Sequence, residues 1–181
     1  MQATFIRHLP TEWNKKAWLQ GRRDIAISPL TGKQQEEIQK NQQLLSQLSP
    51  FDLVLVSTLK RTNQTARLYG FHAKKEGLLD ELDFGEFEGR PKAELMEAYG
   101  RLWTETPSKM TLGESVQNLE YRIIRFLDKY KEKENILIFG HGSWIRAIIS
   151  YAQYGHINNM NKTQVRNNEC ITLLLDGLRI E

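Results

Sequence analysis

Arg7 and His8 stand side by side where a short apolar run ends, and they are the first residues of the chain suited to chemistry. A guanidinium holds phosphate oxygens in a planar fork, and a neutral imidazole is a nucleophile near neutral pH. In an α/β domain, residues at the carboxyl end of a strand lie where such folds bind ligands. An Arg-His dipeptide is more often plain surface charge, so phosphate chemistry depends on partners elsewhere in the chain.

Two later segments supply such partners at the ends of predicted strands. Ser57 follows the apolar run 51–56, and Arg61 lies one turn into the next predicted helix. His141 stands between two glycines after the apolar run 135–139, where a helix amino terminus would attract an anion. Two arginines and two histidines at one point repel one another, and a dianionic phosphate would offset that repulsion. The arginines should also lower the pKa of a neighbouring histidine and keep it neutral.

Alternating elements are predicted to position these residues. Helical periodicity marks residues 33–48, about 60–69, a short stretch from 91 to 98, 116–130 and a helix starting near 142. Buried strands are predicted in the opening apolar run and at 51–56, 135–139 and 170–175, with a turn at 176–177 and a last strand at 178–180. The segments 14–29, 78–89 and 99–113 are predicted to be loops or irregular.

The order of these elements predicts the fold class. Strands that alternate with helices indicate an α/β fold, a three-layer α/β/α sandwich with a central, mainly parallel sheet. Thr31 and Gln34 have the spacing of a capping box for the first long helix. Ser57 or Thr58 is expected to cap the helix that carries Arg61.

Composition restricts the class of protein. The 181 residues are 40% hydrophobic and 26% charged, as in an ordinary globular protein, and we expect one domain over 1–181. A net charge of +3 does not indicate a nucleic-acid partner. Cys170 is the only cysteine, which excludes an intrachain disulfide. No apolar run approaches membrane-spanning length, so we expect a cytoplasmic protein without a membrane partner.

Six short blocks, in this order, resemble the histidine phosphatase superfamily, also called phosphoglycerate mutase-like. They are Arg7-His8 with Thr11 and Asn14, then Ser28-Pro29-Leu30-Thr31, the run from Ser57 to Ala66, the acidic run from Leu79 to Gly89, Gly113-Glu114-Ser115, and Gly140-His141-Gly142. The resemblance covers nearly the whole chain and is closest to the short phosphatase branch, with its α-ribazole and broad-specificity phosphatases. It implies the fold named above and a phosphomonoesterase that needs no metal or other cofactor.

The resemblance also implies roles for individual residues. His8 would be the nucleophile that forms a phosphohistidine, and Glu81 would protonate the leaving oxygen. Arg7, Arg61 and His141 would hold the phosphoryl oxygens. Among the residues that would bind substrate, Asn14 adds a hydrogen bond, and Thr11, Lys15 and Arg22 are expected near the rest of a small anionic phosphate ester.

Several alternatives stay open from the sequence. His8 could be a loop histidine, Arg61 a surface charge, His141 a helix cap, and Glu86 or Glu88 the true acid. The family's usual glycine after the nucleophile is Leu9 here, followed by Pro10. That change could displace the carbonyl that orients the His8 ring, or the Leu9 side chain could narrow the pocket.

The activity has alternatives as well. A phosphoglycerate mutase would use the same phosphohistidine, and a non-catalytic binding protein could share the fold. Sugar phosphates, phosphoglycerate, nucleotide-like phosphates such as α-ribazole phosphate, and phosphoproteins are all candidate substrates. The mutase branch carries a long insertion after the acidic block, whereas only residues 90–112 separate Gly89 from Gly113 here.

Overall fold

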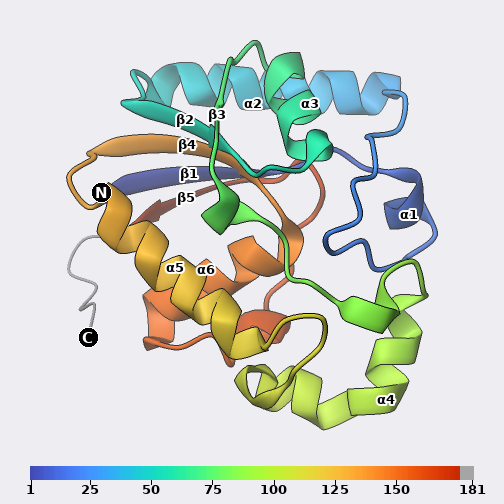
Figure 1. Cartoon of the computed structure of the whole chain (residues 1–181). Coiled ribbons are helices and arrows are strands. Elements are labelled where there is room, and N and C mark those ends of the chain that lie inside the picture. The colour runs from blue at the N-terminus through green and yellow to red at the C-terminus, as the bar shows by residue number, and fades with distance from the viewer. Residues whose placement is uncertain (176–181) are drawn as a thin grey trace.

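Figure 1 shows a computed structural model of the chain, which describes residues 1–175 as a sheet between two layers of helices. The strand order is β3-β2-β4-β1-β5. The pairs β1–β4, β2–β4 and β2–β3 are parallel, and β5 runs antiparallel to β1 at one edge. The strands are β1 (Gln2–Arg7), β2 (Leu53–Val56), β3 (Lys74–Lys75), β4 (Asn135–Gly140) and β5 (Cys170–Leu174). The predicted sandwich with a mainly parallel sheet is therefore confirmed.

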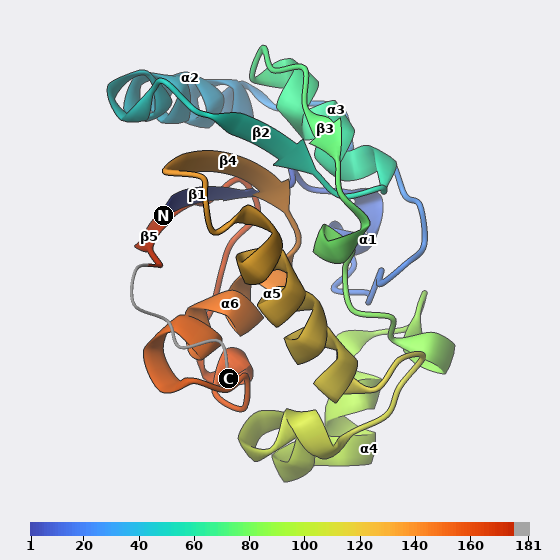
Figure 2. The ribbon, with the colours of Figure 1, turned by 60° about the vertical axis from the view of Figure 1, so that its left-hand side comes forward.

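Helices cover both faces of this sheet, as Figures 1 and 2 show. One face carries α2 (Gly32–Leu48) and α3 (Lys60–Leu68), and the other carries α5 (Val116–Tyr130) and α6 (Gly142–Tyr154). Successive strand residues alternate between two cores, as a pleated strand requires. Ile6, Val56 and Phe139 are fully buried in the core under α2 and α3, while neighbouring strand residues are buried on the other face.

The cap of α2 matches the sequence, and the cap of α3 does not. Thr31 accepts from the backbone of Gln34 in the predicted capping box. The prediction that Ser57 or Thr58 caps α3 is wrong, because the cap position is Leu59 and has no side-chain hydrogen bond. The hydroxyl of Ser57 instead contacts His141, and the Thr58 backbone and hydroxyl donate to Asp80.

Two segments predicted to be irregular contain helix. The helix α4 spans Lys92–Glu105 and so continues past residue 98, with a kink at Gly100, where φ is 40°. The helix continues past residue 98 because Leu95 before the kink and Trp103 after it are both buried in the same hydrophobic core. A one-turn helix, α1 (Glu12–Lys15), begins inside the opening motif with its own Thr11–Asn14 capping box. Short 3₁₀ turns lie at Gly77–Leu79, Gly85–Phe87, Pro107–Lys109 and Met160–Lys162.

The carboxyl ends of β1, β2 and β4 meet at one edge of the sheet. Arg7 lies opposite Gly140, and Val56 lies opposite Phe139. In Figure 1, α1 and α4 lie beyond this edge, on the right of the view. None of the helices in the described residues is both long and apolar enough to cross a bilayer. The predicted turn at 176–177 and strand at 178–180 lie outside the described residues.

Candidate active site

A cavity of about 260 Å³ opens at this edge and brings together side chains from four separate segments. Of the residues singled out in the sequence, its walls contain Arg7, His8, Asn14, Arg61 and Glu81. These come from the end of β1, from α1, from the start of α3 and from the acidic block. Topology places them together, because parallel strands bring their carboxyl ends to the same edge.

The His8 ring is fixed in one tautomer by the carbonyl of the next residue. Its Nδ1 lies 2.7 Å from the oxygen of Leu9, and since a carbonyl can only accept, the proton is on Nδ1. The lone pair is therefore on Nε2. Burial, together with the charges of Arg61 and Arg7, lowers the pKa of His8 well below its ordinary value of 6.5. The ring is neutral at pH 7, the form in which imidazole is a nucleophile.

Leu9 keeps this arrangement intact although it replaces the family's usual glycine. Its carbonyl still orients the His8 ring, and its backbone N–H donates to Thr65 Oγ1 at 3.0 Å. The Leu9 side chain is fully buried in the core under α2 and α3 and is not part of the cavity wall. Neither expected disturbance, a displaced carbonyl or a narrowed pocket, is present.

Arg7 and Arg61 are held by backbone carbonyls instead of carboxylates. Arg7 donates to Val165 O at 2.6 Å, and Arg61 donates to Gly21 O and Arg23 O at 2.8 and 2.7 Å. Their Nε atoms are buried, with no hydrogen-bond partner among the described residues. Burial lowers the pKa of each to about 10, so both stay charged at pH 7. The carbonyls fix the two guanidinium groups without neutralising them, which suits an anion.

Glu81 is the acidic side chain that faces this positive charge. Its oxygens accept from the backbone N–H groups of Leu82, Ser143 and Trp144 at 2.9, 3.1 and 3.2 Å. Two of these donors belong to the first turn of α6, directly after His141. Glu86 is exposed, and Glu88, which accepts from the backbone N–H groups of Arg22 and Phe84, is not in the cavity wall. Of the three candidate acids, only Glu81 lines the cavity.

Two arginines fix the backbone of the loop that carries Glu81. Arg22 Nε donates to Glu81 O at 2.7 Å, and Arg122 Nη1 donates to Asp80 O at 2.6 Å. Both arginines pair with Glu114, at 3.4 and 2.7 Å. Arg22, expected to meet substrate, is not in the cavity wall and is engaged in this cluster of Arg22, Arg122 and Glu114, which we call the loop clamp.

Two other expected substrate-binding residues lie outside the wall as well. The Thr11 hydroxyl accepts from Asn14 N and lies 2.9 Å from Gln20 Oε1, so it serves the cap of α1. Lys15 forms an exposed ion pair with Glu12 at 2.7 Å. Asn14 does line the cavity, and because its Oδ1 accepts from Thr11 N, its amide NH₂ is left to donate elsewhere.

His141 packs edge-on against His8, with the two ring centroids 5.3 Å apart, and is fully buried outside the cavity wall. It occupies the cap position of α6 but makes no side-chain cap hydrogen bond. Its Nε2 lies 2.7 Å from Ser57 Oγ, and its buried Nδ1 has no partner among the described residues. Burial, Arg61, His8 and Arg7 lower its pKa well below 6.5. The ring is therefore neutral at pH 7 before any anion binds.

Sequence reasoning missed two cations that share the cavity wall, Lys92 on α4 and Arg146 on α6. Gly142 makes room for one of them, because a Cβ there would lie 3.2 Å from the guanidinium atoms of both Arg7 and Arg146. Arg146 stands one helical turn after Gly142, so that spacing could have found it. Lys92 follows Pro91 in a segment with no chemical motif, and only the fold brings it here.

The chain is similar in sequence and in fold to several known proteins. An adenosylcobalamin/alpha-ribazole phosphatase of Salmonella typhimurium is 32% identical over 162 residues, covering 83% of this chain and 78% of that protein. A 2,3-bisphosphoglycerate-dependent phosphoglycerate mutase of Cytophaga hutchinsonii is 30% identical over 169 residues, covering 82% and 75%. The crystal structure of the alpha-ribazole phosphatase from Shigella flexneri superposes with a TM-score of 0.75 at 28% identity, covering 95% and 89% of the two chains. A sequence profile of the histidine phosphatase superfamily (branch 1) matches residues 3–178, and the chain belongs to that family.

Proposed function

We propose that the protein is a metal-independent phosphomonoesterase that works through a phosphohistidine on His8. The observation that carries this proposal is the state of the His8 ring: neutral, with its proton on Nδ1 held by Leu9 O, and with Nε2 left unbonded by the described residues in a cavity that Arg7 and Arg61 also line. A nucleophile needs that lone pair, and a phosphate dianion needs that positive charge. Relatives named as phosphatases and as mutases support chemistry of this class.

In the first half of the reaction, Nε2 of His8 bonds to phosphorus while the bond from phosphorus to the ester oxygen breaks. Arg7, Arg61 and the amide of Asn14 donate to the phosphoryl oxygens, and Glu81 gives its proton to the leaving oxygen. The phosphoryl charge raises the pKa of His141, which favours a proton on the buried Nδ1 and a further hydrogen bond.

In the second half, water attacks phosphorus with Glu81 as the base, the bond from nitrogen to phosphorus breaks, and inorganic phosphate leaves. The arginines supply the positive charge that a metal supplies in other phosphoryl-transfer sites. Within residues 1–175, no three His, Cys, Asp or Glu side chains are arranged to hold a metal ion.

The test is a substitution of the nucleophile with a matched control. His8→Ala should lose nearly all turnover of p-nitrophenyl phosphate and keep the fold, while His72→Ala, which changes an exposed histidine, should match the wild type. Enzyme quenched during turnover should carry one acid-labile, base-stable phosphoryl group that His8→Ala lacks. A His8→Ala variant that keeps a tenth of wild-type turnover would refute the proposal.

The same preparation separates a phosphatase from a mutase. Only residues 90–112 lie between Gly89 and Gly113, and they form α4 and a 3₁₀ turn beside the cavity. Without a long insertion to cover the phosphohistidine, we expect water to reach it. Phosphate release from phosphoglycerate should therefore exceed interconversion of its isomers. Primer-dependent interconversion that outruns phosphate release would assign the mutase reaction instead.

A further inference from the structure

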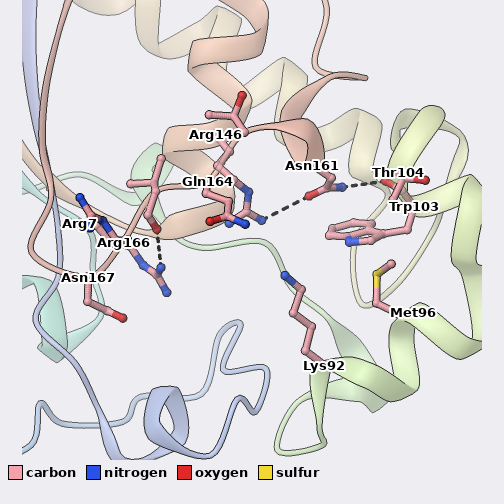
Figure 3. A pocket seen from close by; sticks show the side chains of 12 residues that line it. Arg7, Lys92, Met96, Trp103, Thr104, Arg146, Asn161, Gln164, Arg166 and Asn167 are labelled. Carbon is pink, nitrogen blue, oxygen red and sulfur yellow. Dashed lines mark hydrogen bonds between the residues drawn. The ribbon is translucent and has the colours of Figure 1, made fainter.

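A second cavity, of about 440 Å³, adjoins the catalytic cavity, and the reaction proposed above gives it no role. The two share Arg7, Lys92, Trp103, Arg146 and Asn167 in their walls, so a molecule bound at His8 extends directly into it. Figure 3 shows this second cavity between α4 on one side and α6 with the segment 161–167 on the other. We call it the leaving-group chamber. Its volume is of the size that accommodates a small-molecule ligand.

The chamber is positively charged without a matching carboxylate in its wall. Figure 3 shows the side chains of Lys92 and Arg146 reaching into the space from opposite elements. Arg146 donates only to the neutral oxygens of Ser143 and Asn161, at 3.3 and 3.4 Å. The backbone N–H of Lys92 donates to Ala17 O, but its ammonium group has no hydrogen-bond or ion-pair partner among residues 1–175. Lys92 as a whole residue is exposed, but its ammonium group is partly buried. This burial and the nearby charges of Arg146 and Arg7 lower the pKa of Lys92, as expected for cations that lie close together.

The rest of the wall is polar and uncharged, and it suits hydroxyl groups. Amides and hydroxyls line it, from Thr104, Asn161, Thr163, Gln164 and Asn167, beside the indole of Trp103. Asn161 is held in place by its bonds to Arg146 and to Trp103 O at 2.8 Å, which Figure 3 marks. Amides can donate and accept at once, as recognition of a hydroxyl requires. Thr104, Asn161 and Asn167 already donate to protein carbonyls, so Thr163 and Gln164, whose side chains have no hydrogen bond among the described residues, are the groups most open to a hydroxyl.

We propose that the leaving-group chamber receives a sugar-sized, polyhydroxylated alcohol that carries a second negative charge. This inference rests on the proposed phosphomonoesterase reaction at His8. Lys92 and Arg146 bind the second anionic group, a carboxylate or a second phosphate, and the amides bind the hydroxyls between the two charges. The enzyme thereby prefers doubly anionic sugar phosphates to neutral ones.

The test compares three substrates that differ only at C6 of the sugar. They are α-glucose 1-phosphate, with a neutral hydroxymethyl group, α-glucuronate 1-phosphate, with a carboxylate, and glucose 1,6-bisphosphate, with a phosphate. We expect kcat/KM to be at least about tenfold higher for one or both charged substrates, because hydrogen bonds to charged groups are the strong ones. The carboxylate and phosphate arms distinguish the two kinds of anion.

Substitutions then assign the preference to the chamber. Lys92→Gln and Arg146→Gln should each reduce the charged-to-neutral ratio of kcat/KM several-fold. Arg101→Gln removes an exposed cation from the same helix as Lys92 but outside the chamber wall, and it should keep the wild-type ratio. A ratio near one in the wild type, or a ratio that Lys92→Gln and Arg146→Gln both leave unchanged, overturns the inference.

Binding measurements keep this result separate from the fate of the proposed reaction. The His8→Ala variant is titrated calorimetrically with the same three compounds, which requires no turnover. If a charged compound binds more tightly than the neutral one, and this advantage shrinks in the double variant His8→Ala with Lys92→Gln, the inference about the leaving-group chamber is supported. That result holds even if His8 is not the nucleophile. Equal binding of all three compounds, with p-nitrophenyl phosphate still hydrolysed through His8, refutes the chamber alone.

Discussion

Replacing Glu114 by Gln should destabilise the protein and selectively impair proton donation by Glu81. The Glu114 carboxylate accepts from Arg122 at 2.7 Å, Arg22 at 3.4 Å and Asp83 N at 3.2 Å, and it also binds Asn118. The Glu114 side chain is 12% exposed and that of Arg122 is 10% exposed. Gln keeps the size of the side chain and one oxygen but removes the charge, so Arg122 loses its counterion and Arg22 keeps only its ion pair with Asp80, at 3.2 Å.

The size of the loss follows from this burial. Breaking a buried ion pair by removing one partner costs about 3–5 kcal/mol. Arg22 is 35% exposed and Gln retains one acceptor, so we expect a smaller loss, roughly 2–3 kcal/mol. In a chain of this length that corresponds to a fall of roughly 5–10 °C in Tm. Thermal unfolding of the two proteins measures it directly.

The same change should alter which substrates the enzyme handles well. The loop clamp fixes the carbonyls of Asp80 and Glu81, so its loss lets the Glu81 carboxylate move from the leaving oxygen. An alkyl oxide needs a proton to leave, whereas a nitrophenolate does not. We therefore expect kcat/KM to fall about tenfold or more for an alkyl phosphate and much less for p-nitrophenyl phosphate.

A matched variant separates positioning from general destabilisation. Glu120→Gln changes a carboxylate on α5, the helix that begins two residues after Glu114; Glu120 accepts from the backbone of Ile157 and has no hydrogen bond to the acidic loop among the described residues. It should lower Tm and leave the ratio of the two substrates unchanged. If Glu114→Gln lowers kcat/KM equally for both substrates, the clamp has no part in placing Glu81.

The stability effect has a defined pH dependence. Burial acts to raise the pKa of Glu114, but the charge of Arg122 and the hydrogen bonds prevail and lower it below the ordinary 4.5. A group with a lowered pKa in the folded state stabilises the protein fully above its unfolded pKa and loses that contribution as pH falls through the folded value. The difference in unfolding free energy between the wild type and Glu114→Gln should therefore be full at pH 7 and shrink below pH 4.5. A difference that stays constant in urea titrations down to pH 3 would contradict the assignment of charge to Glu114.

Three further outcomes follow from the site. Glu81→Gln, which alters the acid itself, should impair alkyl phosphates far more than p-nitrophenyl phosphate, and equal losses would make its role structural. Turnover should persist in excess EDTA and be inhibited by vanadate, and a complete loss in EDTA that magnesium restores would contradict the proposed chemistry. Because burial and two arginines depress the pKa of His8, its nucleophilic form persists below pH 6.5. The pH profile of kcat/KM, corrected for ionisation of the substrate, should therefore show no loss of activity near pH 6.5 from protonation of His8. A loss on the acidic side with an apparent pKa of 6.5 or higher would contradict this.

The sequence was sufficient for the layers and for the centre of the site, because both depend on local signals. Continuous apolar runs identified β2 and β4, period-3.6 apolar patterns identified α2 and α5, and these elements determine the sandwich. Arg7, His8 and His141 directly follow strands or lie in them, so the parallel arrangement alone brings them to one edge. Leu9 shows how tolerant that centre is, since the ring is oriented by a backbone carbonyl that any residue provides.

Charged residues outside the strand ends could not be assigned in the same way. Arg22 and Lys15 follow the opening motif in sequence, yet one belongs to the loop clamp and the other to a surface pair with Glu12. Lys92 and Arg146 reach the cavity from α4 and α6, which lie far apart in the sequence. The partner of a long flexible cation is decided by tertiary contacts, and helical periodicity says nothing about them.

The arginines of this protein divide by the kind of acceptor that holds them. Arg122 pairs with Glu114, and Arg22 pairs with Glu114 and Asp80, so their two charges are balanced by two carboxylates and serve to fix a loop. Arg7 and Arg61 are held by carbonyls, which orient a guanidinium but carry no net charge to cancel it. All four guanidinium groups carry a fixed charge and are held by hydrogen bonds, so neither residue type nor the number of bonds distinguishes them. The acceptor does, because only a cation that the protein leaves unbalanced can stabilise the charge of a phosphoryl group in transfer.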